Sequence, residues 1–148
     1  MEYHVRSARL TDVDAAIRML RDAPDSGEQR GDADRLRSLL FLPAATVLVA
    51  EQERRLVGVG VLSIRPSVRQ GPFIGVIDEL GLQGVTDAAD VPGRIEVGGS
   101  IIEQLVSSAR NKGCARVEVT DPLASAEPEL LSSAGFERRG ALLSRAIG

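Results

Sequence analysis

The chain has 148 residues, of which 43% are hydrophobic and 26% charged, and its formal net charge is -3. This balance is typical of one globular domain over residues 1–148, and the absence of a basic stripe argues against a nucleic acid partner. No apolar run is long enough to span a membrane, so no membrane association is expected. A single cysteine cannot form an internal disulfide, and without a signal peptide we expect a cytoplasmic protein.

The first part of the chain predicts a strand, two helices and a hairpin. Residues 3–10 alternate between apolar and polar side chains, as a strand does. Apolar residues at helical spacing predict a helix over 11–23, and a second helix over 33–43 ends at a proline. Residues 24–32 between them have the composition of a loop. Residues 45–64 contain two apolar runs around a charged turn, which predicts a β-hairpin.

The middle of the chain predicts one strand between two loops. Residues 65–72 and 83–94 have loop composition. Residues 73–82 predict a mostly apolar strand that is interrupted by Asp78 and Glu79. Because side chains alternate along a strand, we expect these two carboxylates on opposite faces, with only one pointing into a cleft.

The last part of the chain predicts a helix over 100–112, a strand over 115–121, a short helix over 127–135 and one or two strands within 136–147. The first of these helices has an apolar stripe that we expect to be buried against the sheet, made of Ile101, Ile102, Leu105, Val106 and Ala109. We expect its N-terminus beside the end of the strand over 73–82. The order of all the elements predicts an α/β or α+β domain with a largely sheet-based core.

A pair of glycines stands in front of the helix over 100–112. A helix N-terminus has unpaired backbone N–H groups, and Gly98, Gly99 and Ser100 would let an anion approach them closely. The stretch therefore predicts a phosphate site, although a plain tight turn between strand and helix remains the alternative. Glu96 places a carboxylate just before this turn, where it would repel a phosphate.

The ordered series of segments resembles the GCN5-related N-acetyltransferase (GNAT) superfamily. The stretches that carry the resemblance are "HVRSARLTDVDAAIRML", "TVLVAEQERRLVGVGVLSI", "VIDELGL", "VGGSIIEQLVSSARNKGCARVEV" and "LLSSAGFERRG". It implies the acyl-CoA N-acyltransferase fold, a mixed, mostly antiparallel twisted sheet with helices on both faces. It also implies an acetyl-CoA-dependent enzyme that acetylates a primary amine of a small molecule or peptide, without a metal.

The resemblance further implies where acetyl-CoA binds, through a strand that holds the pantetheine arm and a turn, R/Q-x-x-G-x-G/A, that wraps the pyrophosphate. The residues that it assigns to the cosubstrate are Leu80, Gly81, Leu82, Arg94, Val97, Gly98, Gly99 and Ser100. Two registers fit the turn, with its fixed positions at Gly93, Glu96 and Gly98 or at Arg94, Val97 and Gly99. The first is preferred because the second shortens the helix, but in either register the motif is degraded. Cosubstrate binding is therefore weakened or lost unless the loop is rebuilt around it.

Two catalytic roles follow from the same resemblance. Family members often use a carboxylate on the fourth strand as general base, and Asp78 and Glu79 occupy that strand here, although each could also be a solvated surface residue. The tyrosine that often protonates the leaving thiolate is replaced by Leu131, with Leu130 at the preceding aromatic position. A water molecule would then have to supply that proton.

A second function remains open, since Glu96 and Leu131 also fit a catalytically silent binding or regulatory module with weak or lost CoA binding. Such a module could form a homodimer through its sheet or terminal strands. His4 is the only histidine and Cys114 the only cysteine, so neither a metal site nor a Ser-His-Asp triad is predicted. Cys114 is expected to be an inert thiol packed at the start of a strand.

Overall fold

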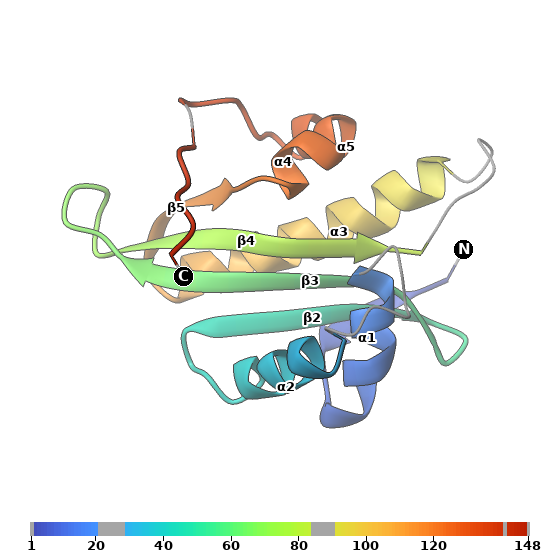
Figure 1. The fold of residues 1–148 in the computed structure, drawn as a ribbon. Helices are drawn as coiled ribbons and strands as arrows, with labels where there is room; N and C mark the ends of the chain where they lie inside the picture. The colour runs from blue at the N-terminus through green and yellow to red at the C-terminus, as the bar shows by residue number, and fades with distance from the viewer. Residues whose placement is uncertain (1, 21–28, 84–90, 141, 148) are drawn as a thin grey trace.

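The structure, a computed structural model, describes residues 2–20, 29–83, 91–140 and 142–147, and it is built around one five-stranded sheet (Figure 1). The strands lie in the order in which they follow in the chain: β1 (His4–Ser7), β2 (Ala45–Gln52), β3 (Arg55–Pro66), β4 (Phe73–Leu82) and β5 (Cys114–Val119). The first three pairings are antiparallel and the pairing of β4 with β5 is parallel. The predicted mixed, mostly antiparallel sheet is thus confirmed.

Helices cover both faces of the sheet, as predicted. A short 3-10 turn, η1 (Leu10–Asp12), leads into α1 (Val13–Leu20), and α1 and α2 (Gln29–Leu39) lie on one face (Figure 1). The long helix α3 (Val91–Asn111) crosses the opposite face. The remaining helices, α4 (Leu123–Ala126) and α5 (Pro128–Ser133), follow β5.

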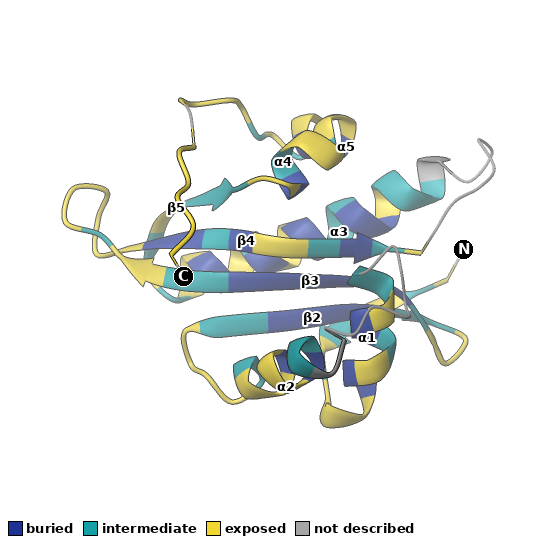
Figure 2. Ribbon diagram, viewed as in Figure 1, coloured by how far each residue is buried: buried dark blue, intermediate teal, exposed yellow. Residues whose placement is uncertain are grey.

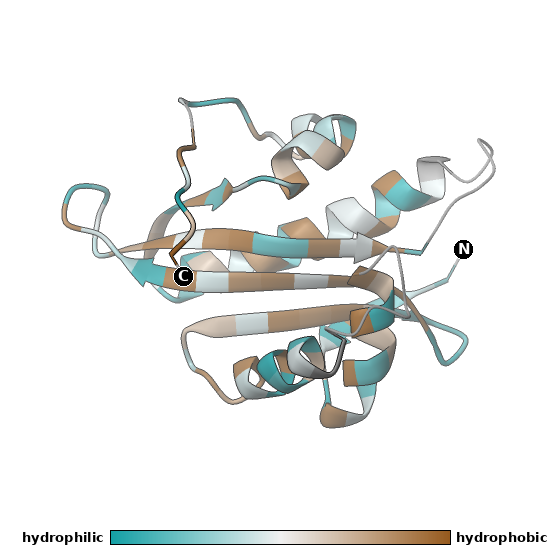
Figure 3. Ribbon diagram, viewed as in Figure 1, coloured by the Kyte–Doolittle hydropathy of each residue, from teal (hydrophilic) through white to brown (hydrophobic). Residues whose placement is uncertain are grey.

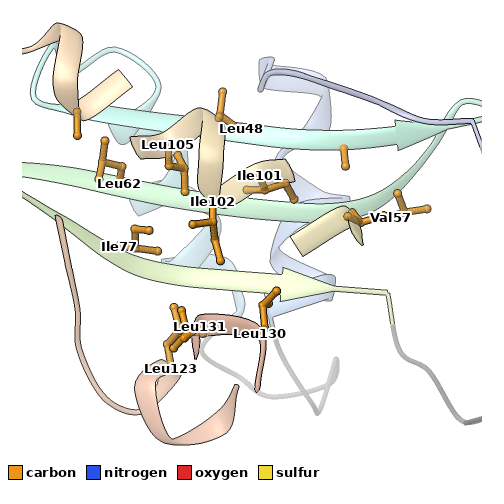
Figure 4. Close-up of a cluster of buried hydrophobic side chains, with 13 residues drawn as sticks. Leu48, Val57, Leu62, Ile77, Ile101, Ile102, Leu105, Leu123, Leu130 and Leu131 are labelled. Atoms are coloured by element: carbon orange, nitrogen blue, oxygen red, sulfur yellow. The ribbon is translucent and has the colours of Figure 1, made fainter. Parts of the chain in front are cut away.

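The core beneath α3 confirms the predicted buried stripe. Ile101, Ile102, Leu105 and Ala109 are fully or almost fully buried, and Val106 is partly buried. They pack on side chains of β2, β3 and β4, together with leucines of α4 and α5 (Figure 4). The helix comes close because β3 contributes glycines there, among them Gly60, where a Cβ atom would lie 2.6 Å from Ile101 Cγ2.

A second core fills the space between the sheet and the α1–α2 pair. Val49, Val59 and Val61 point to this face and pack with Val13 and Ile17 of α1. Because β2 and β3 are covered on both faces, their central residues form continuous buried runs (Figure 2). Apolar residues follow one another there instead of alternating with polar ones, as in other sheets that are buried twice (Figure 3).

Several predicted boundaries are wrong. α3 begins at Val91 and not at residue 100, so residues 91–94 are helical where a loop was predicted. Likewise α2 begins at Gln29, inside another predicted loop. α4 was not predicted, and no strand occurs among residues 136–140 and 142–147, where one or two were expected. Two stretches of the predicted loops over 24–32 and 83–94, namely residues 24–28 and 84–90, lie outside the described residues.

Candidate functional site

β4 and β5 separate halfway along β4, and this separation defines the candidate site. Their last paired residues are Ile77 and Val119, yet β4 continues to Leu82. The edge of β4 over residues 78–82 that faces away from β3 therefore has no strand partner among the described residues. Figure 1 shows β5 leaving the direction of β4 at this point, with α4 and α5 following it. Unpaired backbone groups along such an edge can bond an extended ligand.

A β-bulge lies at the start of this free edge. On the β3 side, Leu62 pairs with Ile77 and Val61 pairs with Glu79, so Asp78 is an extra residue without a partner on β3. A bulge interrupts the alternation of side chains between the two faces. The residues after Ile77 consequently change the face to which they point.

Because of the bulge, both carboxylates lie on the α1–α2 face. Ser63 points to this face, and its hydroxyl donates a hydrogen bond to Asp78 Oδ2 at 2.5 Å. Glu79 lies opposite Val61, whose side chain belongs to the core under α1 and α2. The prediction that Asp78 and Glu79 point to opposite faces is wrong, since it assumed a regular strand. Ser63 was not singled out from the sequence, although the hairpin register could have indicated it.

The carboxyl group of Glu79 has an unusual environment for an exposed residue. Partial burial raises the pKa of Glu79, and the nearby negative charge of Asp78 raises it further. A carboxylate with a raised pKa is a better proton acceptor near neutral pH than an ordinary glutamate. The arrangement can therefore accept a proton at Glu79 while Asp78 holds a hydrogen bond.

Three further predicted residues follow on the free edge of β4. Leu80 and Leu82 point to the α3 side and pack against its core, whereas Gly81 lies against Met19 and Leu20 of α1. A Cβ atom on Gly81 would lie 3.0 Å from the Met19 carbonyl oxygen. The side chains are thus used for packing, and only the backbone of this segment is left to contact a ligand.

The predicted glycine turn does not exist as a turn. Val97, Gly98, Gly99 and Ser100 all lie inside α3, which begins two turns earlier at Val91. In an α-helix the N–H of each residue bonds the carbonyl four residues before it, so the N–H groups of these four residues are engaged inside the helix. The prediction that they sit at a helix N-terminus is wrong. In the first turn, residues 91–94, the N–H groups of Val91, Gly93 and Arg94 have no carbonyl partner within the helix, and Pro92 has no N–H group.

Gly98 has a packing role. A Cβ atom there would lie 2.7 Å from Leu130 Cδ2 and 3.0 Å from Leu82 Cδ1, so the glycine lets α5 and the end of β4 approach α3. At Gly99 a Cβ atom would meet nothing within 4 Å. The contact with Leu82 also confirms that α3 passes beside the end of β4.

The two charged residues near the start of α3 have different surroundings. Arg94 Nη2 donates to both carboxylate oxygens of Glu127, each at 2.6 Å, and the two side chains are 30% and 21% exposed. Glu96 is exposed, and its backbone carbonyl accepts a hydrogen bond from the Tyr3 hydroxyl at 3.3 Å. Arg94 is therefore paired across to the α4–α5 junction, a contact that nothing in the sequence indicated.

The position expected for a catalytic tyrosine is part of the core. Leu131 is 6% exposed and packs with Leu123 and Leu130 beside β4 (Figure 4). Leu131 itself has no hydroxyl group, and the hydroxyl of the nearby Ser133 donates to the Leu130 carbonyl at 2.8 Å. The only tyrosine, Tyr3, is hydrogen-bonded at the other side of α3.

The remaining candidates fit structural roles. Cys114 begins β5 and is partly buried, and burial raises the pKa of its thiol, which disfavours the nucleophilic thiolate. His4 Nε2 lies 3.2 Å from Glu51 Oε2 on the neighbouring strand β2. Within the described part of the chain, no group of three or more His, Cys, Asp or Glu residues could hold a metal ion, and no helix is long and apolar enough to cross a membrane.

Comparison of the sequence with protein-family models and with curated proteins found no match. Comparison with solved structures found the same fold at low identity. A transcriptional regulator from Bacillus halodurans C-125 has a TM-score of 0.78 and 16% identity, over 99% of this chain and 100% of that one. An aminoglycoside N-acetyltransferase in complex with CoA has a TM-score of 0.78 and 13% identity, over 99% of this chain and 95% of that one. Glucosamine-6-phosphate N-acetyltransferase from Arabidopsis thaliana has a TM-score of 0.73 and 13% identity, over the whole of both chains.

These likenesses confirm the fold that the resemblance implied. The chain has the acyl-CoA N-acyltransferase fold of the GNAT acetyltransferases, with a mostly antiparallel open sheet and helices on both faces. At 11% to 20% identity the likeness concerns the fold, and the activity must be argued from the residues of this chain.

Proposed function

We propose that this protein is an acetyl-CoA-dependent N-acetyltransferase of the cytoplasm that acetylates a primary amine of a small molecule or peptide. The observation that carries the proposal is the free backbone edge of β4 over residues 78–82, which begins at two carboxylates. An extended ligand such as a pantetheine arm can add to such an edge as another strand would. The aminoglycoside N-acetyltransferase, which has the same fold and is in complex with CoA, supports the choice of acetyl-CoA as cosubstrate.

Only some of the residues that the sequence assigned to acetyl-CoA can keep that role. The backbone of Leu80, Gly81 and Leu82 suits the pantetheine arm, because these residues have no strand partner on the β5 side within the described part of the chain. The pyrophosphate cannot be wrapped by residues 97–100, whose N–H groups are engaged inside α3. The first turn of α3 offers unpaired N–H groups and the charge of Arg94 instead. Acetyl-CoA supplies the activated thioester, and the protein supplies its orientation.

The residues on the α1–α2 face account for the transfer. The amine nitrogen attacks the thioester carbonyl carbon, the carbon–sulfur bond breaks, and an amide forms. Glu79, with its raised pKa, accepts the proton that the amine loses. Asp78, held by Ser63, favours a cationic acceptor next to it. Water supplies the proton for the leaving thiolate, because Leu131 has no proton to give.

Release of free CoA thiol in the presence of a panel of amines tests the proposal. Glu79→Gln should lower kcat/KM about a hundredfold. The pH profile of kcat/KM should also lose its acidic limb, because the group that titrates there is removed. Glu103→Gln, on an exposed turn of α3, is the matched control and should behave as the unaltered protein. Unchanged kinetics in both Glu79→Gln and Asp78→Asn would remove the carboxylates from the reaction.

A catalytically silent binding or regulatory module is the second candidate. Two observations favour it: the glycines of the expected phosphate turn lie inside a helix, and Leu131 is buried where a tyrosine was expected. A solved structure of the same fold is described as a transcriptional regulator. Such a module would bind acetyl-CoA weakly or not at all and would release no CoA thiol with any amine, which separates it from the enzyme.

We also propose that two copies of the chain can associate through their C-terminal segments. Leu142, Leu143 and Ile147 are 59%, 91% and 98% exposed, which is unusual for apolar side chains in sequence proximity (Figure 3). The outer edge of β5 has no partner strand within the described residues, so the segment of a second copy could pair with it. Light scattering should give twice the monomer mass, and removal of residues 137–148 should return the monomer. A full-length monomer at high concentration would contradict this.

A further inference from the structure

The contact between Arg94 and Glu127 joins two elements that flank the free edge of β4. Arg94 lies in the first turn of α3, and Glu127 lies between α4 and α5. Both carboxylate oxygens of Glu127 lie 2.6 Å from the same guanidinium nitrogen. Both side chains are partly buried, so solvent screens this ion pair less than it screens a fully exposed one.

An apolar contact lies beside the ion pair and joins the same elements. Leu130 is 3% exposed and fits into the space that Gly98 leaves open on α3. Leu82, the last residue of β4, lies against the same glycine. Figure 4 shows Leu130 next to the end of β4. The first turns of α3, the end of β4 and α5 thus pack directly on one another.

The charges around Arg94 are unfavourable for an anion while this contact exists. Arg94 is the only basic residue between Arg69 and Arg110 in the sequence. Glu127 neutralises it, and Glu96 adds an exposed carboxylate two residues further on. The guanidinium group of Arg94 is already paired, so a phosphate that used this cation would have to displace Glu127 from it first.

We propose that Arg94, Glu127 and Leu130 form a latch that closes α5 onto α3, and that a phosphate-bearing acyl-CoA binds by displacing Glu127 from Arg94. The inference rests on the proposed function, because it concerns the regulation of the same site. Its physical basis is competition: the carboxylate and the phosphate need the same guanidinium group. When the latch opens, Leu130 leaves Gly98, and the end of β4 becomes accessible between α3 and α5.

The test compares CoA titrations by calorimetry with hydrogen exchange of the α5 amides in the absence of CoA. Glu127→Gln should bind CoA about fivefold more tightly, because the competing charge is removed while the side chain keeps its size. Without ligand, its α5 amides should exchange faster than those of the unaltered protein. Glu129→Gln, on the exposed side of α5, is the matched control and should change neither quantity.

A second background separates the latch from a general effect of charge. In Arg94→Gln, the further change Glu127→Gln should no longer tighten CoA binding, because no guanidinium group is released. Equal CoA affinity of the unaltered protein and Glu127→Gln, or equal exchange of their α5 amides, would overturn the latch alone. If neither the unaltered protein nor any variant bound CoA, the proposed function would fall and the latch with it.

Discussion

Gly98 and Gly99 are neighbours in α3, but their surroundings set opposite requirements on the residue. Gly98 faces Leu130 and Leu82 at distances that leave no room for a Cβ atom, whereas Gly99 faces open space. Glycine in a helix interior costs about 1 kcal/mol relative to alanine. At Gly98 this cost is offset by the close packing of α5 and β4, and at Gly99 nothing in the structure offsets it.

Alanine at these two positions should therefore have opposite effects on the free energy of unfolding. Gly99→Ala should raise it by about 1 kcal/mol, because the helix gains propensity without a clash. Gly98→Ala should lower it by about 1 to 3 kcal/mol, because Leu130 must move. Urea unfolding measures both. Destabilisation by Gly99→Ala together with a neutral Gly98→Ala would show that this stretch is not helical.

A partly buried ion-pair network holds β1, η1 and β2 together. Arg6 Nη1 and Nη2 donate to the two carboxylate oxygens of Asp12 at 2.7 and 3.1 Å, and Arg6 Nε donates to Glu51 at 3.0 Å. Asp12 Oδ2 also accepts the backbone N–H of Arg9 at 2.7 Å. Chiefly through the Arg6 hydrogen bonds, the pKa of Asp12 is lowered from its usual value.

Asp12→Asn should lower the free energy of unfolding at pH 7 by about 2 kcal/mol, since it removes a charged hydrogen-bond acceptor from a buried position. The stabilisation by Asp12 is complete above the usual aspartate pKa of about 4 and is lost as the pH falls through its lowered folded value. The variant should accordingly lose less stability on acidification. Asp34→Asn, in an exposed pair on α2, is the control and should change less than about 0.5 kcal/mol.

The contribution of Glu79 to the free energy of unfolding should have the opposite dependence on pH. Because its pKa is raised in the folded protein, the folded state binds more protons than the unfolded state between the usual and the raised value. Stability from this residue is therefore greatest below about pH 4 and falls as the pH rises through the folded pKa. Glu79→Gln should be more stable than the unaltered protein at pH 7 and equal to it at pH 3.5. Equal stability at both pH values would contradict a raised pKa.

At the scale of elements, β2, β3 and β4 were predicted well, whereas the start of α3 and the strands expected within 136–147 were wrong. β4 has the predicted bounds, because its apolar run lies between segments of clear loop composition. The start of α3 was misplaced because two adjacent glycines indicate a turn. Pro92 suits the first turn of a helix and could have indicated the true start. Partial burial of Ile95 and full burial of Val97 extend the helix through the glycines. Tertiary packing thus overrides local propensity here.

The bulge in β4 shows why the common face of Asp78 and Glu79 could not be predicted. Sequence alternation assigns Asp78 and Glu79 to opposite faces, and this holds only for a regular strand. The extra residue at Asp78 depends on how β4 pairs with β3, which no local pattern indicates. Residue types and strand were therefore predictable, but their common orientation was not. The Arg94–Glu127 pair was equally hidden, because it joins residues 33 positions apart.

At the scale of the whole molecule, the sheet has two cores, and the candidate site lies beside both. The core under α3 reaches the end of β4 through Leu82, and the core under α1 and α2 reaches it through Gly81. The order of elements along the chain predicted an α/β or α+β domain with a sheet-based core, because many apolar segments contribute to it. The particular fold was implied by the family resemblance. The proposed cosubstrate site includes the start of α3, where a change of backbone from turn to helix alters which N–H groups lack a partner within the helix.

Calorimetric titration of acetyl-CoA into the whole protein tests the central claim, that the free edge of β4 and the first turn of α3 together hold an acyl-CoA. We expect saturable binding of one acetyl-CoA per chain, weakened by salt because Arg94 would contact the phosphates. Pantetheine, which lacks the phosphates, should bind more weakly and without this salt dependence. Absence of binding for acetyl-CoA and CoA at millimolar concentration would contradict the account and leave a protein with this fold but without its cosubstrate.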